Sequence, residues 1–333
     1  MFDVIIVLSI VVCFGLAGVY ARLCNILIAP VADRPRKNPM RHCIAMATAF
    51  SLICVCGPAG HTKDPVRPEG APPNLVVLVY QKFPFDKMAE RDKWETAAAR
   101  ACADLKVPNS WIVLEAVTGE PEVLSFDPFD SFAHVNQAFA EWGPIYASHP
   151  ELGKLQAQIN SALASQRTVI AVRRDDLSYR ANRIDLAKAR FLRVLEVRLH
   201  PGHEVELAEA FQKLSAAYEK TDSDLPWVVY QVNVGMPSPT FFAFVPMKTL
   251  GQNDDLLNQW EKLRQAEGEA AERMQQIARE AYAHTESNLY FISPEKSHVS
   301  KEFAAGDPEF WTPKPQAPAK PTVRKSGQSK PKQ

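Results

Sequence analysis

The amino-acid sequence predicts an α+β fold, in which two tandem βαββαβ units form a pseudo-dimeric α/β barrel behind one or two apolar N-terminal helices. An internal repeat is the first observation: Trp111 and Gly119 recur 116 residues later as Trp227 and Gly235. The second observation is that strands and helices are expected in the same order in both copies. A fixed period of this kind indicates that one supersecondary unit was duplicated.

The repeat extends beyond these four residues. Phe126 recurs as Phe242 at the same spacing of 116 residues, and Trp142 recurs as Trp260 at a spacing of 118. At 333 residues the chain is long enough for two domains of ordinary size, each able to bury a core. We therefore expect two similar units about a pseudo-twofold axis, with a shared interior.

The composition is typical of a globular protein, with 46% hydrophobic and 23% charged residues. Lys plus Arg and Asp plus Glu both number 38, so we expect no nucleic-acid partner. Of the 6 cysteines, all but Cys102 precede residue 57. Because no CxxC spacing is present, neither a disulfide framework nor a cysteine metal site is expected.

The first unit, residues 74–178, follows a Pro/Gly/Lys-rich linker at residues 61–73. Its first strand is rich in β-forming residues, and an Ala-rich amphipathic helix follows. The helical sequence that starts at Ser131 is broken near Pro150, because proline cannot continue the hydrogen bonding of a helix. The predicted elements are a strand at 75–83, a helix at 86–105, strands at 111–118 and 123–126, helices at 131–149 and 151–165, and a strand at 168–173.

The second unit, residues 190–297, repeats this order. Its predicted elements are a strand at 191–200, a helix at 204–220, strands at 227–234 and 240–245, a helix at 255–283, and a strand at 288–292. The order βαββαβ is that of the ferredoxin-like unit. Such a unit places its helices on one face of an antiparallel sheet, and the other face needs a cover. Two tandem copies can cover one another.

The segment 197–207, VRLHPGHEVEL, has a strand, a Pro-Gly turn and an acidic helix start. It resembles the dimeric α/β-barrel superfamily, which includes antibiotic-biosynthesis-type monooxygenases, haem-degrading relatives and NIPSNAP-like proteins. The resemblance covers roughly residues 74–296, although the first copy has the departing sequence FPFD at 83–86. It implies either a cofactor-independent monooxygenase or a haem-handling enzyme. In the latter case haem is the implied cofactor, and His134 and His284 are the histidines on or near helices.

Two apolar runs precede the globular part. The first lies within residues 1–39 and is close to the length that a membrane-spanning helix needs. The second, within residues 40–60, follows a basic cluster and has the form of a signal peptide that starts at Met40, or of a second transmembrane helix. If translation begins at Met40, the first 39 residues are not part of the protein. Both alternatives remain open.

The basic cluster between the two apolar runs predicts a cytoplasmic loop. Everything after about His61 is then expected on the outer side of the membrane, in the cell envelope and either anchored or secreted. If the N-terminal segment is uncleaved, the membrane itself is a partner. At the other end, residues 298–333 are predicted to be a disordered, basic Pro/Lys-rich tail. Residues 307–311 are interpreted as a capped terminus, or as a clip onto the domain or a protein partner.

Strand alternation predicts which polar residues face the barrel interior. In the strand 191–200, the apolar set is expected to face the helices, whereas Glu196, Arg198 and His200 are expected inside. Equivalent polar positions on the other strands complete a predicted ligand pocket. The candidate residues are Tyr80, Lys82, Glu115, Glu196, Arg198, His200, Gln231 and Asn233.

A histidine beside a glutamate and an arginine could act as a general acid or base. The same residues could equally form interior or rim ion pairs, and no spacing supplies a third metal ligand. Three hypotheses follow. The chain is a binding or structural barrel for a small apolar ligand, an oxygenase or haem-handling enzyme, or a membrane-tethered scaffold that acts through its basic tail. The catalytic residues, the substrate and any protein partner are not specified by the sequence.

Overall fold

A computed structural model of the chain describes residues 67–220, 223–266 and 268–312. The predicted N-terminal segments at 1–39 and 40–60, and residues 313–333 of the predicted tail, lie outside these described residues. Within the described ranges, every helix is too short or too polar to span a lipid bilayer.

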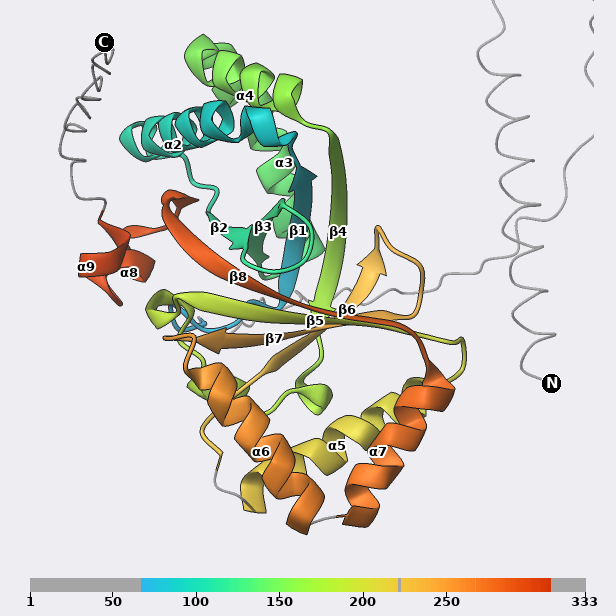
Figure 1. Cartoon of the computed structure of the whole chain (residues 1–333). Helices are drawn as coiled ribbons and strands as arrows, with labels where there is room; N and C mark the ends of the chain where they lie inside the picture. Colours follow the sequence, from blue (N-terminus) through green and yellow to red (C-terminus); the bar gives the residue numbers. More distant parts are fainter. Residues whose placement is uncertain (1–66, 221–222, 267, 313–333) are drawn as a thin grey trace, which may run out of the picture. The chain divides into compact units, whose positions relative to one another are not determined.

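Eight antiparallel strands form a closed barrel in the order β1-β3-β2-β8-β5-β7-β6-β4 (Figure 1). The strands are β1 (Leu75–Lys82), β2 (Trp111–Ala116), β3 (Glu122–Phe129), β4 (Ser165–Arg173), β5 (Phe191–Leu199), β6 (Val228–Val234), β7 (Thr240–Met247) and β8 (Tyr282–His298). The predicted α+β barrel of two ferredoxin-like units is therefore confirmed. At the level of the fold, so is the resemblance to the dimeric α/β-barrel superfamily.

Each half contributes four neighbouring strands, and the two sheets join where β2 pairs with β8 and β4 pairs with β6. Helices cover the outer face of each sheet, so the helices of the two halves lie on opposite sides of the barrel (Figure 1). The first half carries α2 (Met88–Leu105), α3 (Phe132–Ser148) and α4 (Pro150–Ala162). The second half carries α5 (Glu204–Lys220), α6 (Gln252–Ala266) and α7 (Gly268–Ala281). Short 3-10 helices are η1 (Phe85–Lys87), η2 (Asp175–Leu177), η3 (Ala181–Arg183) and η4 (Leu186–Lys188).

The repeated tryptophans make the same hydrogen bond in both halves. The indole Nε1 of Trp111 donates to the carbonyl oxygen of Lys296 at 3.0 Å. In the other half, Nε1 of Trp227 donates to the carbonyl oxygen of Leu177 at 2.9 Å. Trp111 of β2 is thereby bonded to β8, the last strand of the second unit. Trp227, directly before β6, is bonded to residue Leu177, which follows β4, the last strand of the first unit.

A pair of serines repeats in the same way. Ser297 Oγ accepts a hydrogen bond from the backbone N–H of Val113, and Ser178 Oγ accepts one from Val229, both at 2.9 Å. These contacts put Ser297 and Ser178 in equivalent places, as the tryptophan contacts do for Lys296 and Leu177. The duplication seen in the sequence is therefore preserved in the polar contacts at both junctions between the sheets.

Two predicted elements in the second unit differ from the structure. The single helix predicted at 255–283 is two helices, α6 and α7, with Gly268 at the start of the second. The strand predicted at 288–292 is wrong in extent, because β8 runs over 17 residues. Its first part pairs with β5 and its last part pairs with β2, so one strand serves both halves of the barrel.

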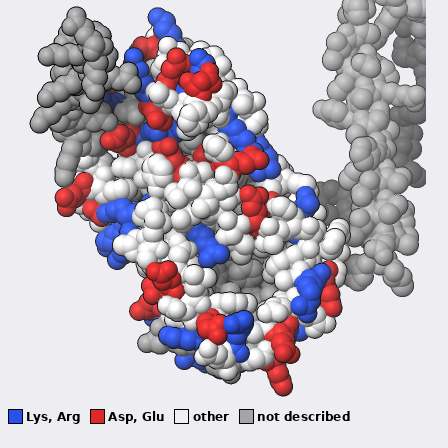
Figure 2. All heavy atoms as spheres, viewed as in Figure 1, with Lys and Arg blue, Asp and Glu red and all other residues white. Residues whose placement is uncertain are grey.

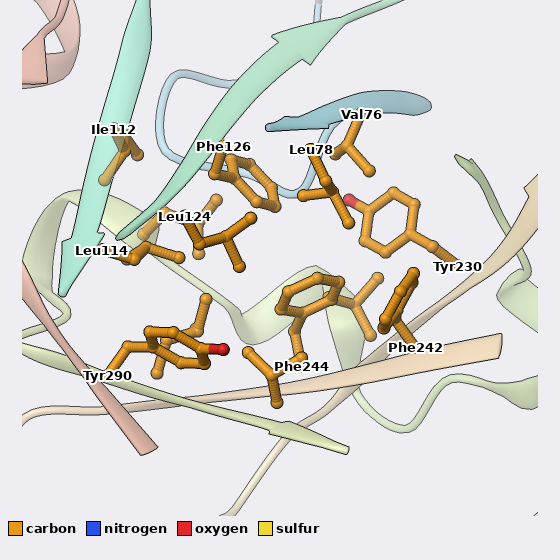
Figure 3. Close-up of a cluster of buried hydrophobic side chains, with 14 of the residues drawn as sticks. Val76, Leu78, Ile112, Leu114, Leu124, Phe126, Tyr230, Phe242, Phe244 and Tyr290 are labelled. Atoms are coloured by element: carbon orange, nitrogen blue, oxygen red, sulfur yellow. The ribbon is translucent and has the colours of Figure 1, made fainter. Parts of the chain in front are cut away.

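The middle of the barrel is filled by side chains. Aromatic rings meet edge to face there, with Phe126 5.7 Å from Phe244 and Tyr230 5.6 Å from Phe244 between ring centroids. The Tyr230 hydroxyl donates to the carbonyl oxygen of Pro73 at 2.9 Å, which satisfies its buried polar atom. Ten residues of this cluster are labelled in Figure 3: Val76, Leu78, Ile112, Leu114, Leu124, Phe126, Tyr230, Phe242, Phe244 and Tyr290. The interior is a packed core over most of its length.

The prediction of a disordered tail from residue 298 is wrong for residues 298–312. This segment forms α8 (Lys301–Ala304) and α9 (Pro308–Trp311), and it packs on the barrel. Trp311 is 5% exposed and belongs to the interior core, and its Nε1 donates to the carbonyl oxygen of Ala187 at 2.7 Å. Phe303 packs edge to face on the Trp311 ring at 5.1 Å. The burial of these aromatic rings outweighs the polar, proline-rich composition that suggested disorder.

Substitution Trp311→Ala should lower the free energy of unfolding by about 3 kcal/mol, because it removes a buried aromatic side chain and its hydrogen bond. Urea denaturation followed by far-UV circular dichroism measures this change. Lys301→Ala, on the exposed side of α8, is the matched control and should change the free energy by less than about 0.5 kcal/mol. Equal unfolding midpoints for Trp311→Ala and the unsubstituted chain would show that this segment adds nothing to the core.

Candidate functional site

The face of the molecule shown in Figure 2 has no dominant charge. Acidic and basic side chains are interspersed over the described residues of the face shown in Figure 2. This agrees with the equal numbers of the two kinds in the whole sequence. A candidate site is therefore best sought in the hollows of the fold, where a few convergent groups can act on a small molecule.

Four of the predicted site residues line one mouth of the barrel. Tyr80, Lys82, Glu196 and Arg198 surround a cavity of about 520 Å³. Other charged or polar side chains complete its lining: Glu120, Glu122, Arg167, His284, Glu286, Asn288 and Tyr290. The prediction that polar groups of the strand 191–200 converge inside the barrel therefore applies to this end.

Several groups at the mouth pair with one another. The Tyr290 hydroxyl donates to Glu122 Oε1 at 2.6 Å, and Lys82 pairs with Glu120. The Arg167 guanidinium lies 4.9 Å from the centre of the Tyr80 ring. Burial raises the pKa of Glu196, with nearby cations opposing the shift. Because the packed core lies beneath these groups, the mouth is a polar rim around a filled barrel.

The other four predicted residues do not lie in this cavity. Glu115 is on the outer, helix-covered face of β2. Gln231 is on the outer face of β6, where its side chain accepts a hydrogen bond from Arg174 at 2.6 Å. Asn233 follows it on the same face and is exposed. His200 is exposed beyond the end of β5.

The placement of Glu115 and Gln231 follows from the repeated tryptophans. Side chains of a strand alternate between faces, so Glu115 shares the face of Trp111 and Gln231 shares that of Trp227. Both indoles lie under the helices, where they donate to a backbone carbonyl. The predicted interior orientation of these two polar residues is therefore wrong, and apolar neighbours such as Ile112 fill the interior instead.

A second cavity, of about 290 Å³, lies in the first half, between the outer face of its sheet and the helices α2, α3 and α4. We call it the first-half cavity. One wall is aromatic: Trp142 lies 6.3 Å from Trp111 and stacks on Tyr146 at 5.3 Å between ring centroids. The wall is formed by one residue of β2 and two of α3. Such a surface suits a flat apolar molecule.

Two polar residues of β3 face this cavity from the sheet. Leu124 and Phe126 of β3 point into the barrel, so Ser125 and Asp127 point toward the helices. The Ser125 hydroxyl donates to Asp127 Oδ1. Burial raises the pKa of the Asp127 carboxyl to about 7, and the serine hydrogen bond opposes part of that shift. Near neutral pH both protonation states of Asp127 are therefore populated.

A cluster of buried charges closes one end of the cavity. Arg91 of α2 is 0% exposed, and its Nε donates to Glu95 Oε2 at 2.8 Å. Lys296 of β8 pairs with Glu115 and, at 2.5 Å, with Asp92. Burial raises the pKa of Glu95, although the Arg91 guanidinium opposes the shift. Lys296 also lines the cavity, so the second unit supplies one residue of a site in the first half.

The same region of the second half is filled with core. At the spacing of 116 residues, Ser125 corresponds to Phe241 and Asp127 corresponds to Ala243. Phe241 is 2% exposed and packs in the cluster beneath α5 and α7. A ring in one half therefore stands where the other half has a serine hydroxyl.

The helices α2 and α5 also begin 116 residues apart, which relates their positions. Arg91 then corresponds to Leu207, and Glu95 corresponds to Phe211. Both Leu207 and Phe211 are buried in the second-half core. Three further pairs follow the same trend: Ala98 with Leu214, Cys102 with Tyr218, and, from the tryptophan hydrogen bonds, Lys296 with Leu177. At these positions the second half has large, mainly apolar side chains, whereas the first half has small or charged ones.

The fold itself does not require this cavity. The second half shows that apolar side chains can fill the space between such a sheet and its helices. Burying charges there is costly compared with packing apolar groups of similar size. Perturbed titratable groups in a cleft are typical of functional sites. The first-half cavity is therefore the stronger candidate, and a position-by-position comparison of the two copies would have found it in the sequence.

The residues that line the first-half cavity do not fit a haem group. Haem iron takes a His, Cys, Met or Tyr ligand from the protein. Neither His134 nor His284 lines this cavity. Burial raises the pKa of the Cys102 thiol to about 11, which leaves it protonated at neutral pH. Burial also raises the pKa of Tyr146, whose ring is stacked on Trp142.

Comparisons with known proteins give distant similarities of fold. An anthrone oxidase-like protein is 13% identical, with 68% of this chain and 93% of that chain covered and a TM-score of 0.43. A chlorite dismutase variant from Candidatus Nitrospira defluvii is 10% identical, with 67% and 93% covered and a TM-score of 0.44. A haem-binding protein from Thermus thermophilus is 10% identical, with 69% and 93% covered and a TM-score of 0.40.

No protein-family model matches the chain, and no curated protein matches it. At these identities and TM-scores, the solved structures support no inference about chemistry. The fold assignment rests on the strand pairing of the chain itself.

Substitution Asp127→Asn should stabilise the chain at pH 8 by on the order of 4 kcal/mol and leave its stability at pH 4 almost unchanged. The unfolded carboxyl ionises near pH 4 and the folded one near pH 7. Raising the pH through this window therefore favours the unfolded state, and a neutral asparagine escapes that loss. Urea denaturation at both pH values measures the difference.

Asp130→Asn is the matched control for this experiment. Asp130 is exposed, just beyond the end of β3, and pairs with Arg67 at 3.4 Å. Its substitution should change stability by less than about 0.5 kcal/mol at either pH. A pH-independent effect of Asp127→Asn would contradict the proposed burial of this carboxyl.

Proposed function

We propose that the first half of the barrel binds a small, flat, mainly apolar molecule that carries one hydrogen-bonding or ionisable group. The site is the first-half cavity. One observation carries the proposal: large core side chains of the second half are replaced here by small or charged ones, such as Phe241 by Ser125. The first copy therefore lacks the packing energy that the second copy gains from its filled core.

The shape and lining of the cavity support this class of ligand. Its volume of about 290 Å³ is at the lower end of the range for small-molecule sites. The aromatic wall of Trp111, Trp142 and Tyr146 offers flat apolar area at low entropic cost. On the sheet side, Ser125 and Asp127 offer a donor and an ionisable acceptor. A fused-ring phenol or ketone of about ten carbons matches both sides.

The enzyme alternative fits the same cavity. A cofactor-independent monooxygenase must take a proton from its substrate before oxygen reacts, and Asp127 is a group that could accept it. The haem-handling alternative lacks a suitable axial ligand in this cavity. The scaffold alternative relies on the basic tail, most of which lies outside the described residues.

Binding of 2-tetralone and 2-naphthol to the full chain, measured by isothermal titration calorimetry and by quenching of tryptophan fluorescence, tests the proposal. Ala98→Leu, which introduces the residue of the second half, should weaken binding at least about tenfold by filling the cavity. Ser125→Phe introduces the residue that the second half has at the corresponding position, Phe241, and should also weaken binding at least about tenfold. Both changes reproduce packing that the fold already contains.

Ala103→Leu is the matched control, because Ala103 is an exposed residue of the same helix. It should leave the affinity unchanged. Thermal unfolding by circular dichroism establishes that each variant is folded. Failure of the unsubstituted chain to bind either probe, or equal binding by Ala98→Leu and Ala103→Leu, would overturn the proposal.

The proposed site is located in the cell envelope, on the outer side of the membrane. The support is the basic cluster between the two apolar N-terminal runs, all within the first 60 residues. Mass spectrometry of the N-terminus of the native protein should find either an intact membrane-bound chain or a cut near Ala59. An uncut chain recovered in the cytosolic fraction would contradict this location.

A further inference from the structure

We infer that Asp127 is a general acid–base that exchanges a proton with the molecule bound in the first-half cavity. The inference rests on the proposed function and extends it from binding to proton transfer. It assigns a substrate class: a fused-ring ketone or phenol whose C–H or O–H group is acidic. It also assigns a reaction class, which is the interconversion of keto and enol tautomers.

The carboxylate lies on the sheet side of the cavity, whereas two rings of the aromatic wall lie on the helix side. Asp127 belongs to the sheet, whereas Trp142 and Tyr146 belong to α3, and all three line the same cavity. A flat molecule that stacks on the wall therefore presents a face or an edge toward β3. General-base catalysis requires the base within hydrogen-bonding distance of the proton that it takes. The small side chain of Ser125 beside Asp127 leaves room for that approach.

The hydrogen bond from Ser125 orients the carboxyl group. Because the hydroxyl donates to Oδ1, the other oxygen of Asp127 remains available to a ligand. Burial brings the pKa of the group to about 7, so it can both accept and return a proton near neutral pH. In the second half, Ala243 occupies the corresponding position, so the carboxyl group is not a requirement of the repeated strand.

The other charged or titratable groups that line the cavity come from three elements. Glu95 and Cys102 are on α2, Tyr146 is on α3, and Lys296 is on β8. The polar residues that β1, β4 and α4 contribute to the lining are all neutral: Gln81, Gln166 and Gln156. Lys296 is the basic residue of the lining, and its ammonium group is already paired with Asp92 and Glu115.

The proton transfer is balanced without another reactant. The C–H bond next to the ketone breaks, its proton forms an O–H bond with Asp127, and the electron pair remains on the ligand as an enolate. Return of a proton from Asp127 to the oxygen gives the enol, and return to carbon restores the ketone. No group is oxidised or reduced in this sequence. In heavy water, the returned hydrogen is deuterium.

Loss of the C1 proton signals of 2-tetralone in heavy water, followed by NMR with the full chain, measures this exchange above the buffer rate. We expect the catalysed rate to rise about fivefold between pH 6 and pH 7 and to level off above about pH 8, since the deprotonated carboxyl is the active form and half of it is present near pH 7. Asp127→Asn should lower the catalysed rate at least about a hundredfold. Its affinity for 2-tetralone should stay within about threefold.

Two variants separate a catalytic role from a structural one. Ser125→Ala removes the hydrogen bond that lowers the pKa of Asp127, so the midpoint of the pH profile should move to higher pH. Asp130→Asn, the exposed aspartate beyond the end of the same strand, should leave both the rate and the midpoint unchanged. Glu95→Gln should preserve the rise with pH, because Asp127 and not Glu95 is the base.

The outcomes distinguish this inference from the proposed function. Binding of 2-tetralone without catalysed exchange would overturn the inference and leave the binding site intact. Undiminished exchange in Asp127→Asn would also overturn it. Absence of binding in the unsubstituted chain would instead overturn the proposed function on which the inference rests.

Discussion

The pairing of backbone groups at the two junctions between the sheets determines the rest of this structure. A four-stranded sheet with helices on one face leaves its other face and its two edges uncovered. Here the edges meet as β2 with β8 and as β4 with β6, which closes the barrel and places both bare faces against one core. The 17 residues of β8 pair with its two neighbours in succession, the first part with β5 and the last part with β2.

The core of the second half and the first-half cavity lie at equivalent places, between the sheet and the helices of each unit. In each half, a layer of helices must be held away from the sheet at a distance that side chains fill. The second half fills it with rings such as Phe211, Phe241 and Trp227. The first half holds its helices with buried charges and with the stacked rings of α3, and an open volume remains between them. The two halves therefore share a backbone plan while having different interiors.

The sequence was sufficient for the fold, because the recurrence of Trp111 as Trp227 and the order of elements reflect backbone constraints that act within each copy. It was insufficient for β8, whose polar residues 284–288 carry no strand pattern and are held by pairing with β5. It also assigned Glu115 and Gln231 to the wrong face, since polarity alone does not reveal that the tryptophans set the alternation. The cavity escaped notice because Ser125 and Asp127 look like ordinary exposed positions of a strand. Their role depends on how α2, α3 and α4 pack over the sheet, which the polarity of β3 alone does not show.

Lys296 reaches the first-half cavity from the last strand of the second unit, and this has a consequence for how such a site can arise. In an assembly of two identical subunits, every change that hollows one subunit hollows the other, and the whole assembly loses core twice. Covalent fusion of the copies removes that symmetry, so one copy can remain a rigid support while its twin diverges. A chain of this kind can afford a single asymmetric pocket that a true homodimer of the same fold would have to carry in duplicate.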